Sequence, residues 1–336
     1  MRKTTSMTVA MLGWTATLAA SHSAFGQSSV SLRGVIDAGV TYVNNQHGGT
    51  AALFDSGILT PNTLTLSGSE DLGSGNKAVF ELTSQFDAGS GMTIPGAGQI
   101  FNRTAYVGLS NDRFGTLTFG NQYDFMFETL ALGRFDGALL FGGLYDFRQG
   151  PFTALGVPDN PTGSFDFDRM AGATRVPDSV KYRSPNISGL TFGALYGFGG
   201  VPGSLSANST ISFGANYERG SLGVGAAYVE VKYPQLGNGQ YKAGALWRVS
   251  GPWAWGLDYQ YMKGNEILEN NQAHQVATAL QYNFSKRTVA YVEAVYQRAS
   301  GDGPITRAWI NGLNQPDGAA GNRSQTLARI GLQTKF

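Results

Sequence analysis

Large apolar residues alternate with small or polar ones along much of the chain. In the stretch 251–261, the odd positions from Trp253 to Tyr261 carry tryptophan, leucine or tyrosine, and the even positions carry small or polar residues. Successive side chains of a β-strand point to opposite faces, so this stretch is predicted to be a strand with one apolar face. The same alternation recurs at 30–42, 190–198, 211–218, 241–249 and 324–336. The pattern predicts an all-β, antiparallel fold, but a soluble sandwich would alternate as well as a barrel would.

The lengths of the connections favour a barrel. Short turns are expected near 71–76, 111–115, 185–189, 219–220, 250–252 and 284–286, and long loops near 44–57, 88–100, 124–174, 200–208, 233–239, 264–271 and 300–322. Aromatic residues gather near the ends of the apolar faces, among them Tyr42, Phe86, Tyr106, Phe198, Tyr217, Tyr261 and Tyr282. Short turns on one rim, long loops on the other and aromatic girdles are typical of transmembrane β-barrels of the outer membrane. Six turns and seven loops join fourteen strands and put both termini on the short-turn, periplasmic rim.

Composition agrees with a membrane barrel. The chain has 47 Gly, 20 Phe and 15 Tyr, and only 14% of its residues are charged, against roughly 25% in ordinary globular proteins. Beyond the N-terminus, no stretch approaches the ~20 consecutive apolar residues of a membrane helix. A barrel is the other architecture that satisfies every backbone group within lipid. With 24 Lys+Arg against 23 Asp+Glu, the chain lacks the concentrated positive charge of a nucleic-acid-binding protein. It has no cysteine, so it forms neither disulfides nor thiolate metal sites.

The first 26 residues have the features of an export signal. Arg2 and Lys3 give a positive start, the run 9–20 is mostly apolar, and small residues at Ala24 and Gly26 suit a signal peptidase. As a membrane anchor this run is too short and too polar. We therefore expect a signal peptide at 1–26 and a single barrel domain at 27–336.

An enzymatic role is not expected. The mature region keeps only His47 and His274, and no serine nucleophile motif accompanies His274, as a barrel phospholipase would require. Asp159, Asp166 and Asp168 could offer oxygen ligands to a cation, but their spacing fits no known binding loop. We expect no catalytic residue, no cofactor and no metal.

Several stretches, in order along the chain, carry a family resemblance. They read LRGVIDAGVTY (32–42), SGSEDLGSGNKAVFEL (67–82), FNRTAYVGLS (101–110), FGTLTFGNQY (114–123), DSVKYRSPNISGLTFGALYGF (178–198), YNFSKRT (282–288) and the terminal RIGLQTKF. Together they resemble the trimeric general porins of the neisserial and β-proteobacterial type. The resemblance implies a homotrimer of sixteen-stranded barrels whose long third loop, here 124–174, folds into the pore. The resemblance implies sixteen strands, two more than the fourteen counted from the sequence. Either the chain forms a fourteen-stranded variant of the barrel, or two irregular strands are hidden within 124–174.

The resemblance and the alternation together suggest a charged pore constriction. The resemblance implies acidic groups on the long loop facing basic groups on the wall, and matches two of the wall arginines to Arg103 and Arg175. Alternation independently points Lys181 and Arg183 inward, because their neighbours Val180 and Tyr182 take the lipid face. In the alternation, Arg103 falls on the same face as the apolar residues that follow it. It can therefore face the lumen only if the strand has a bulge there or if Arg103 lies at the rim of the constriction. The candidates are Glu128, Asp136 and Asp146 on the loop, and Arg103, Arg175, Lys181 and Arg183 on the wall.

Three basic groups common in the family are missing here. Thr63 and Ser67 stand where relatives commonly carry a basic pair, and Asn121 stands in Gly-Asn-Gln in place of the common Gly-Arg-Gln. Rings of charge at a constriction select ions by sign. We therefore expect weak ion selectivity.

The sequence predicts a general diffusion porin for passive passage of small hydrophilic solutes and ions across the Gram-negative outer membrane. One alternative is a channel selective for a particular anion, amino acid or sugar. A structural or receptor barrel with a plugged lumen is disfavoured, because the inward positions are rich in Gly, Ser, Thr and Ala. The expected partners are two further copies of the chain, outer-membrane lipid and lipopolysaccharide, and the barrel-assembly machinery, for which the terminal Phe336 would be the signal; no nucleic acid is expected.

Overall fold

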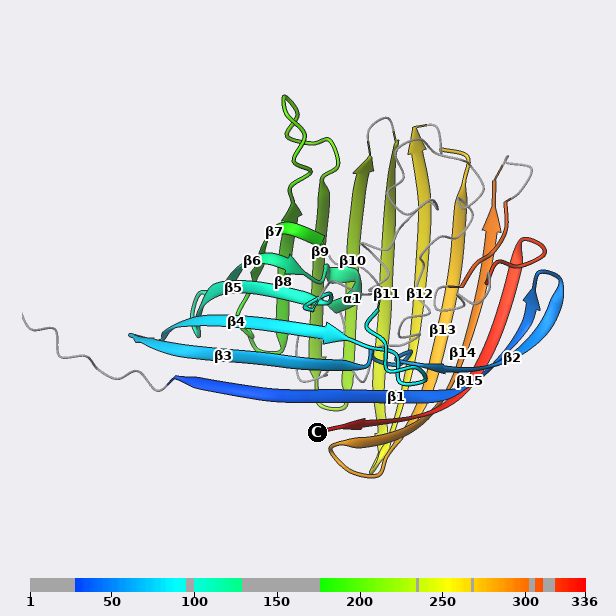
Figure 1. Ribbon diagram of the computed structural model, residues 1–336, viewed down its shortest axis with the longest axis horizontal. Coiled ribbons are helices and arrows are strands. Elements are labelled where there is room, and N and C mark those ends of the chain that lie inside the picture. Colours follow the sequence, from blue (N-terminus) through cyan, green and yellow to red (C-terminus); the bar gives the residue numbers. More distant parts are fainter. Residues whose placement is uncertain are drawn as a thin grey trace, which may run out of the picture.

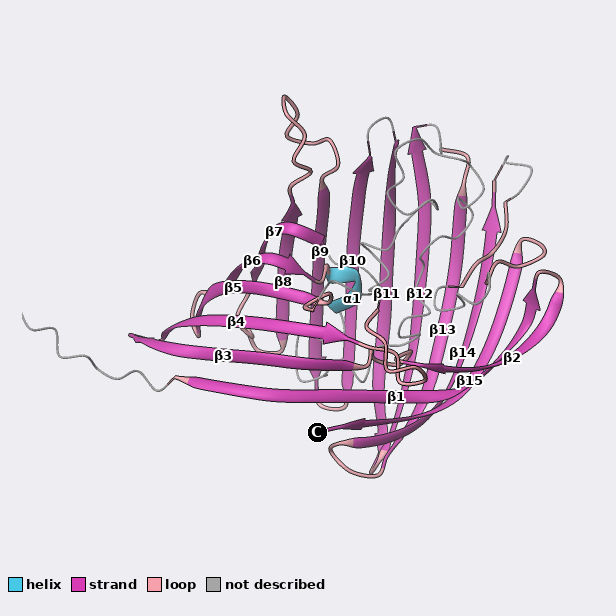
Figure 2. Ribbon diagram, in the orientation of Figure 1, coloured by secondary structure: helices cyan, strands magenta, loops and turns pink. Residues whose placement is uncertain are grey.

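The alternating segments form β-strands that pair into one antiparallel sheet, and among the described residues one short helix interrupts the series of strands (Figures 1 and 2). This computed structural model describes residues 28–94, 100–128, 176–233, 236–266, 269–301, 306–310 and 318–336. Within these ranges, no helix combines the length and apolarity needed to cross a bilayer. The all-β, antiparallel prediction is confirmed.

The elements follow one another along the chain with few insertions. The strands are β1 (Ser29–Gln46), β2 (Gly49–Ser56), β3 (Thr63–Gly73), β4 (Asn76–Gln85), β5 (Thr104–Asn111), β6 (Gly115–Gln122), β7 (Val176–Arg183), β8 (Leu190–Gly197), β9 (Thr210–Arg219), β10 (Leu222–Tyr233), β11 (Leu236–Ser250), β12 (Trp253–Glu266), β13 (Gln272–Asn283), β14 (Thr288–Ser300) and β15 (Ser324–Lys335). The helix α1 (Phe125–Glu128) lies between β6 and β7.

The fifteen described strand segments occupy fourteen places in the sheet. From β3 to β15, each strand pairs with the next one along the chain, and β15 also pairs with β1. One edge of β1 pairs with β3 through its first half and with β2 through its second half. β2 and β3 are therefore two halves of one strand position, interrupted at 57–62, and β2 has no second strand neighbour among the described residues.

Fourteen is the number counted from the sequence, and the described strands on either side of the long connection, where two further strands were considered, are direct neighbours in the sheet. β6 pairs directly with β7, and residues 129–175 between them lie outside the described residues. β12 likewise pairs directly with β13. The sixteen strands implied by the resemblance are not found in the described part of the chain.

Two expected long loops are wrong. The stretch 44–57 contains the end of β1 and all of β2, which form a hairpin through His47 and Gly48, both at positive φ. The stretch 233–239 contains the start of β11, which pairs with β10 from Leu236 onward. In both stretches, polar and glycine residues suggested a loop, but backbone pairing continues through them.

The two faces of the sheet differ as the alternation predicted. Large apolar side chains such as Leu32, Phe213 and Trp255 are exposed on what we call the outer face. Polar side chains such as Asp258 and Gln297 are buried on the opposite, inner face. An apolar outer face over a polar inner face is the arrangement of a barrel whose outside meets hydrocarbon.

Residues 306–310, between β14 and β15, cover part of the inner face. The Trp309 N–H donates to Gln297 Oε1 at 2.6 Å, and the Ile310 N–H donates to Gln325 Oε1 at 2.8 Å. Ile310 also joins an apolar cluster with Val295 and Leu327 of these two strands. The inner side near β14 and β15 is therefore filled by the chain itself.

A buried ion-pair network joins the first and last strands on the inner face. Arg329 of β15 places Nη2 3.2 Å from Asp37 Oδ1 of β1, and its Nη1 contacts Asp55 of β2. Its Nε donates to Tyr291 Oη at 2.7 Å, and Tyr291 in turn donates to Asp37 Oδ2 at 2.7 Å. Each buried charge therefore has a charged partner and a hydrogen bond, which buried ions require.

Asp37 also shapes the interruption between β2 and β3. Its Oδ1 accepts the N–H groups of Ile58 at 2.7 Å and Leu59 at 3.2 Å. Asn62, at the end of the interruption, accepts the Asp37 N–H at 2.7 Å. One carboxylate thus binds both the terminal strand and the irregular segment.

Candidate functional site

The helix α1 lies against the inner face of β8, β9 and β10 (Figure 1). The Phe125 N–H donates to Ser212 Oγ at 3.0 Å, and Asp124 accepts the Phe127 N–H at 3.0 Å, as an N-cap residue does. A Cβ placed on Gly193 would lie 2.2 Å from the Phe125 ring, and one on Gly214 would lie 2.7 Å from Phe125 Cβ. Phe125 therefore occupies the space that two missing side chains leave on the wall.

A buried arginine secures the residues around the helix. Arg103 has no exposed surface, and its carbon Cζ lies 5.1 Å from the centroid of the Tyr123 ring and 5.3 Å from that of Phe127. Its Nε donates to Tyr123 Oη and its Nη1 to Gln85 Oε1. Tyr123 and Phe127 stack with their ring centroids 4.0 Å apart. Arg103 thus ties the start of the long connection to β4.

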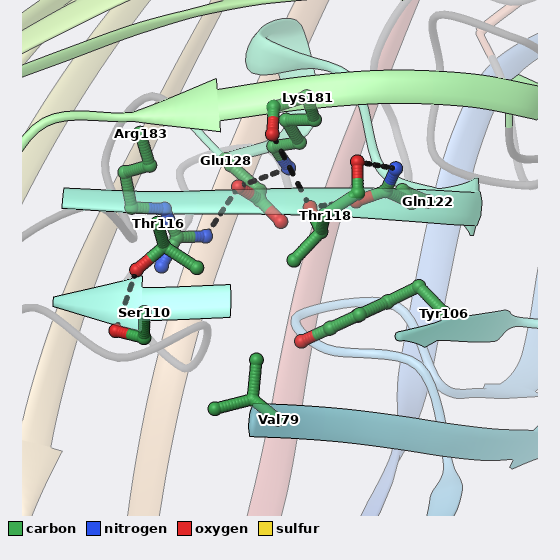
Figure 3. Close-up of a pocket in the computed structure, with 9 residues that line it drawn as sticks. All are labelled: Val79, Tyr106, Ser110, Thr116, Thr118, Gln122, Glu128, Lys181 and Arg183. Atoms are coloured by element: carbon green, nitrogen blue, oxygen red, sulfur yellow. Dashed lines mark hydrogen bonds and ion pairs between the residues drawn. The ribbon is translucent and has the colours of Figure 1, made fainter. Parts of the chain in front are cut away.

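Glu128, the last residue of α1, lies between two cations of β7 (Figure 3). Its Oε2 is 2.6 Å from Lys181 Nζ and 2.7 Å from Arg183 Nη2. Lys181 also donates to the Tyr123 carbonyl at 2.8 Å, and its side chain is only 5% exposed. Arg183 is 41% exposed, so it carries the charge most accessible to water.

The two cations also determine the protonation of Glu128. Burial acts to raise the pKa of this carboxyl, but attraction to Lys181 and Arg183 and their hydrogen bonds outweigh it, so the pKa lies below its usual range. Glu128 is therefore ionised at neutral pH.

Two water-accessible hollows lie beside this cluster. The smaller, about 200 Å³, is lined by Val79, Tyr106, Ser110, Thr116, Thr118, Gln122, Glu128, Lys181 and Arg183 (Figure 3). The larger, about 490 Å³, shares Tyr106, Glu128 and Arg183 with it and is also lined by Arg33, Val35, Thr60, Pro61, Thr63, Thr65, Glu81, Thr83, Tyr123, Phe127 and Lys335. Within the larger hollow, Arg33 and Glu81 form an ion pair at 2.5 Å. The lining of the two hollows comes mainly from β1, β3 to β7 and α1.

The structure brings together some of the candidate residues and separates another from them. Glu128, Lys181 and Arg183 form one cluster, with both cations on the face opposite exposed Tyr182. Arg103 lines neither hollow, because Tyr123 and Phe127 cover its guanidinium. Asp136, Asp146 and Arg175 lie outside the described residues.

Sequence reasoning missed the apolar anchor of the helix. The inward glycines Gly193 and Gly214 suggested an open lumen, whereas they provide the seat of Phe125. It also missed Tyr123 and Phe127 as the cover of Arg103. Two aromatic residues flanking an inward-folding loop, together with glycines at facing inner positions, are the signals that could have indicated this packing.

The fold and the charged hollows define a channel protein of the β-barrel class. The chain belongs to the Gram-negative porin family, whose model matches residues 13–245 and 207–302. It is accordingly a protein of the Gram-negative outer membrane.

Curated relatives are similar at modest identity. The outer membrane porin protein 32 of Delftia acidovorans is 27% identical over 96% of this chain and 98% of its own length. An outer membrane porin protein of Bordetella pertussis is 27% identical over 60% of this chain, and the match spans 54% of that porin. The major outer membrane protein P.IA of Neisseria meningitidis serogroup C is 27% identical over 62% of this chain, a match that spans 51% of its length.

Solved structures share the fold. The anion-selective porin from Comamonas acidovorans aligns with a TM-score of 0.62 at 21% identity, over 92% of this chain and all of that one. The trimer form of OmpT from Vibrio cholerae aligns with a TM-score of 0.51 at 12% identity, over 92% of this chain and 99% of that one.

Proposed function

We propose that this protein is a general diffusion porin, which lets small hydrophilic solutes and ions pass through a water-filled channel. The observation that carries the proposal is the cluster of Glu128, Lys181 and Arg183, which stands beside hollows lined by hydroxyl, amide and charged groups. Such a lining offers water-like partners to many solutes and encloses none of them in a shaped apolar pocket, as a dedicated ligand site would.

The cluster acts on solutes through its field. Glu128 extends from α1 and the two cations from β7, so opposite charges meet across the inner side of the wall. A field of this kind orients dipolar solutes and penalises apolar ones, because an apolar solute must displace the water that solvates the charges.

The charge balance of the lining supports a mild preference for anions. Four basic side chains line the two hollows, Arg33, Lys181, Arg183 and Lys335, against two acidic ones, Glu81 and Glu128. The similar fold of an anion-selective porin is consistent with this sign. The two acidic groups offset half of this positive charge, so the excess is small and the selectivity is weak.

A substrate-selective channel is the second candidate. Half-exposed Arg183 shares the smaller hollow with the hydroxyl groups of Ser110, Thr116 and Thr118. A guanidinium beside several hydroxyls is suited to a small carboxylate or phosphate. Saturable transport of one such anion would favour this candidate.

Planar bilayer recording tests the proposal. The purified protein should insert in ohmic steps whose conductance rises in proportion to salt, and a salt gradient should give a small reversal potential of anion-selective sign. Conductance that saturates with one solute would replace the general porin by the selective channel. Insertion without conductance would refute both.

We also propose that the protein works as a homotrimer in contact with lipopolysaccharide, and that the barrel-assembly machinery inserts it after removal of the signal peptide at 1–26. The trimer form of a structural neighbour supports the first part. The position of Phe336 supports its role as an assembly signal. Its ring is exposed on the outer face above Gly34. Its backbone forms two hydrogen bonds with Gly34, with N···O distances of 2.9 and 3.0 Å. Conductance in steps of three equal levels tests the trimer, and the yield of folded Phe336→Ser in the outer membrane tests the signal.

A further inference from the structure

A row of aromatic side chains crosses the outer face of β12 to β14 near the long loops. Tyr259 and Tyr296 are exposed there, each in register with Val276 of β13. Tyr259 Oη and His274 Nδ1 form a hydrogen bond of 2.7 Å. Tyr261 packs against the same imidazole, with ring centroids 4.9 Å apart. Aromatic residues in this position mark the boundary between hydrocarbon and headgroups.

Two arginines stand one step closer to the loops than this aromatic row. Arg298 of β14 is in register with His274 on one side and Ser324 of β15 on the other, and it is exposed. Arg323 precedes β15, and its Nη2 donates to the Gly301 carbonyl at 3.1 Å. Among the described residues, neither guanidinium forms an ion pair with a carboxylate.

These two arginines line a hollow of their own. It measures about 420 Å³ and is lined by Tyr296, Arg298, Asn322, Arg323 and Ser324. The lining therefore combines two positive charges, an amide, a hydroxyl and one aromatic ring. Guanidinium groups match phosphate oxygens in a planar, bidentate arrangement, and the amide and hydroxyl add further hydrogen-bonding groups.

The position of the hollow in the membrane selects its occupant. The long loops of such barrels face the cell exterior, so the hollow lies at the outer leaflet. It opens on the lipid-facing side, directly above the aromatic row and away from the channel hollows near β1 and β3 to β7. An acyl chain could lie along the apolar outer face below Tyr296 while its headgroup reaches the arginines.

We propose that Arg298 and Arg323, with Asn322 and Ser324, bind the phosphorylated headgroup of an outer-leaflet lipid. The inference depends on the outer-membrane location and on the outward orientation of the long loops. It does not depend on the ion selectivity of the channel.

The test measures binding of a lipopolysaccharide that carries lipid A phosphates to the full-length protein in detergent, by native mass spectrometry. The double variant Arg298→Gln/Arg323→Gln should lose affinity by about tenfold or more, as expected when charge-assisted hydrogen bonds are removed. The matched control is Arg219→Gln, which removes an exposed arginine of the outer face on the opposite, short-turn rim and should leave the affinity unchanged.

Three further measurements make the result decisive. Enzymatically dephosphorylated lipopolysaccharide should bind as weakly to the native protein as the intact lipid binds to the double variant. Inorganic phosphate at millimolar concentration should not displace the lipid, because it lacks the acyl contacts. Arg298→Lys/Arg323→Lys should retain intermediate affinity, since it keeps the charges but not the bidentate geometry.

Equal binding of the dephosphorylated lipid would overturn the proposal. So would a site saturated by inorganic phosphate alone, or a double variant that dissociates into monomers, which would assign the face to contact between copies of the chain. Single-channel conductance of the double variant should match that of the native protein, so a failure of the porin proposal would be recognised separately.

Discussion

Replacing Glu128 by glutamine tests the electrostatic role of the cluster directly. The side chain keeps its size and a hydrogen-bonding oxygen, while the negative charge between Lys181 and Arg183 is removed. The lining of the two hollows then changes from four basic and two acidic groups to four basic and one acidic. We expect anion permeability to rise relative to cation permeability.

The size of the change follows from the position of the charge. One unit charge about 5 Å from a passing ion is worth about 0.8 kcal/mol in bulk water. An anion gains and a cation loses this amount, and screening over a Debye length of about 10 Å at 0.1 M salt reduces the combined effect to about 1 kcal/mol. The permeability ratio should therefore shift about fivefold toward anions at 0.1 M salt, and by less than about twofold at 1 M, where the Debye length is about 3 Å.

Reversal potentials across a bilayer in a potassium chloride gradient measure this ratio. Glu128→Asp keeps the charge and should stay near the native value, and Glu70→Gln removes an exposed acid that lines neither hollow. A shift toward cations in Glu128→Gln, or an equal shift in Glu70→Gln, would refute the assignment of the field to Glu128.

Three other predictions follow from the contacts around the cluster and the seam. Because the pKa of Glu128 is lowered, its charge should persist through mildly acidic pH and be lost only below the usual glutamate range. There, reversal potentials of the native channel should move further toward anions than those of Glu128→Gln, which lacks this titrating group. Gly193→Val should expel Phe125 from its seat, because even a Cβ would lie 2.2 Å from the ring, and single-channel recording should show an altered conductance; native conductance and noise would contradict the anchoring role. Arg329→Met should lower the unfolding free energy by about 3–5 kcal/mol, seen as a reduced thermal midpoint in detergent, and Asp37→Asn in the same background should restore part of it, because it removes the orphaned buried carboxylate.

The strand faces could be predicted from the sequence because they depend on local alternation alone. Trp253, Leu257 and Tyr259 are exposed and Asp258 is buried, as their parity indicated. Lys181 and Arg183 were found by the same reasoning, since it requires only the outward position of Tyr182.

Features that depend on distant partners could not be predicted in this way. Asn45 belongs to a polar stretch that suggested a loop, yet its Nδ2 donates to Asn322 Oδ1 at 3.0 Å and to the Ser324 carbonyl at 2.9 Å. These partners lie more than 270 positions away and allow the strand to continue. Arg103 behaves similarly, because Tyr123 and Phe127 of a separate segment cover it.

The electrostatics of the cluster thus rest on apolar packing. Phe125 and Glu128 are three positions apart on one helical turn, so the place where the ring is seated fixes where the carboxylate can reach. Seating the ring requires that two facing wall positions, Gly193 and Gly214, carry no side chain. A substitution there would move the negative charge without altering any charged residue. The selectivity of related channels should accordingly vary with the size of the wall residues beneath the helix as well as with the number of charges.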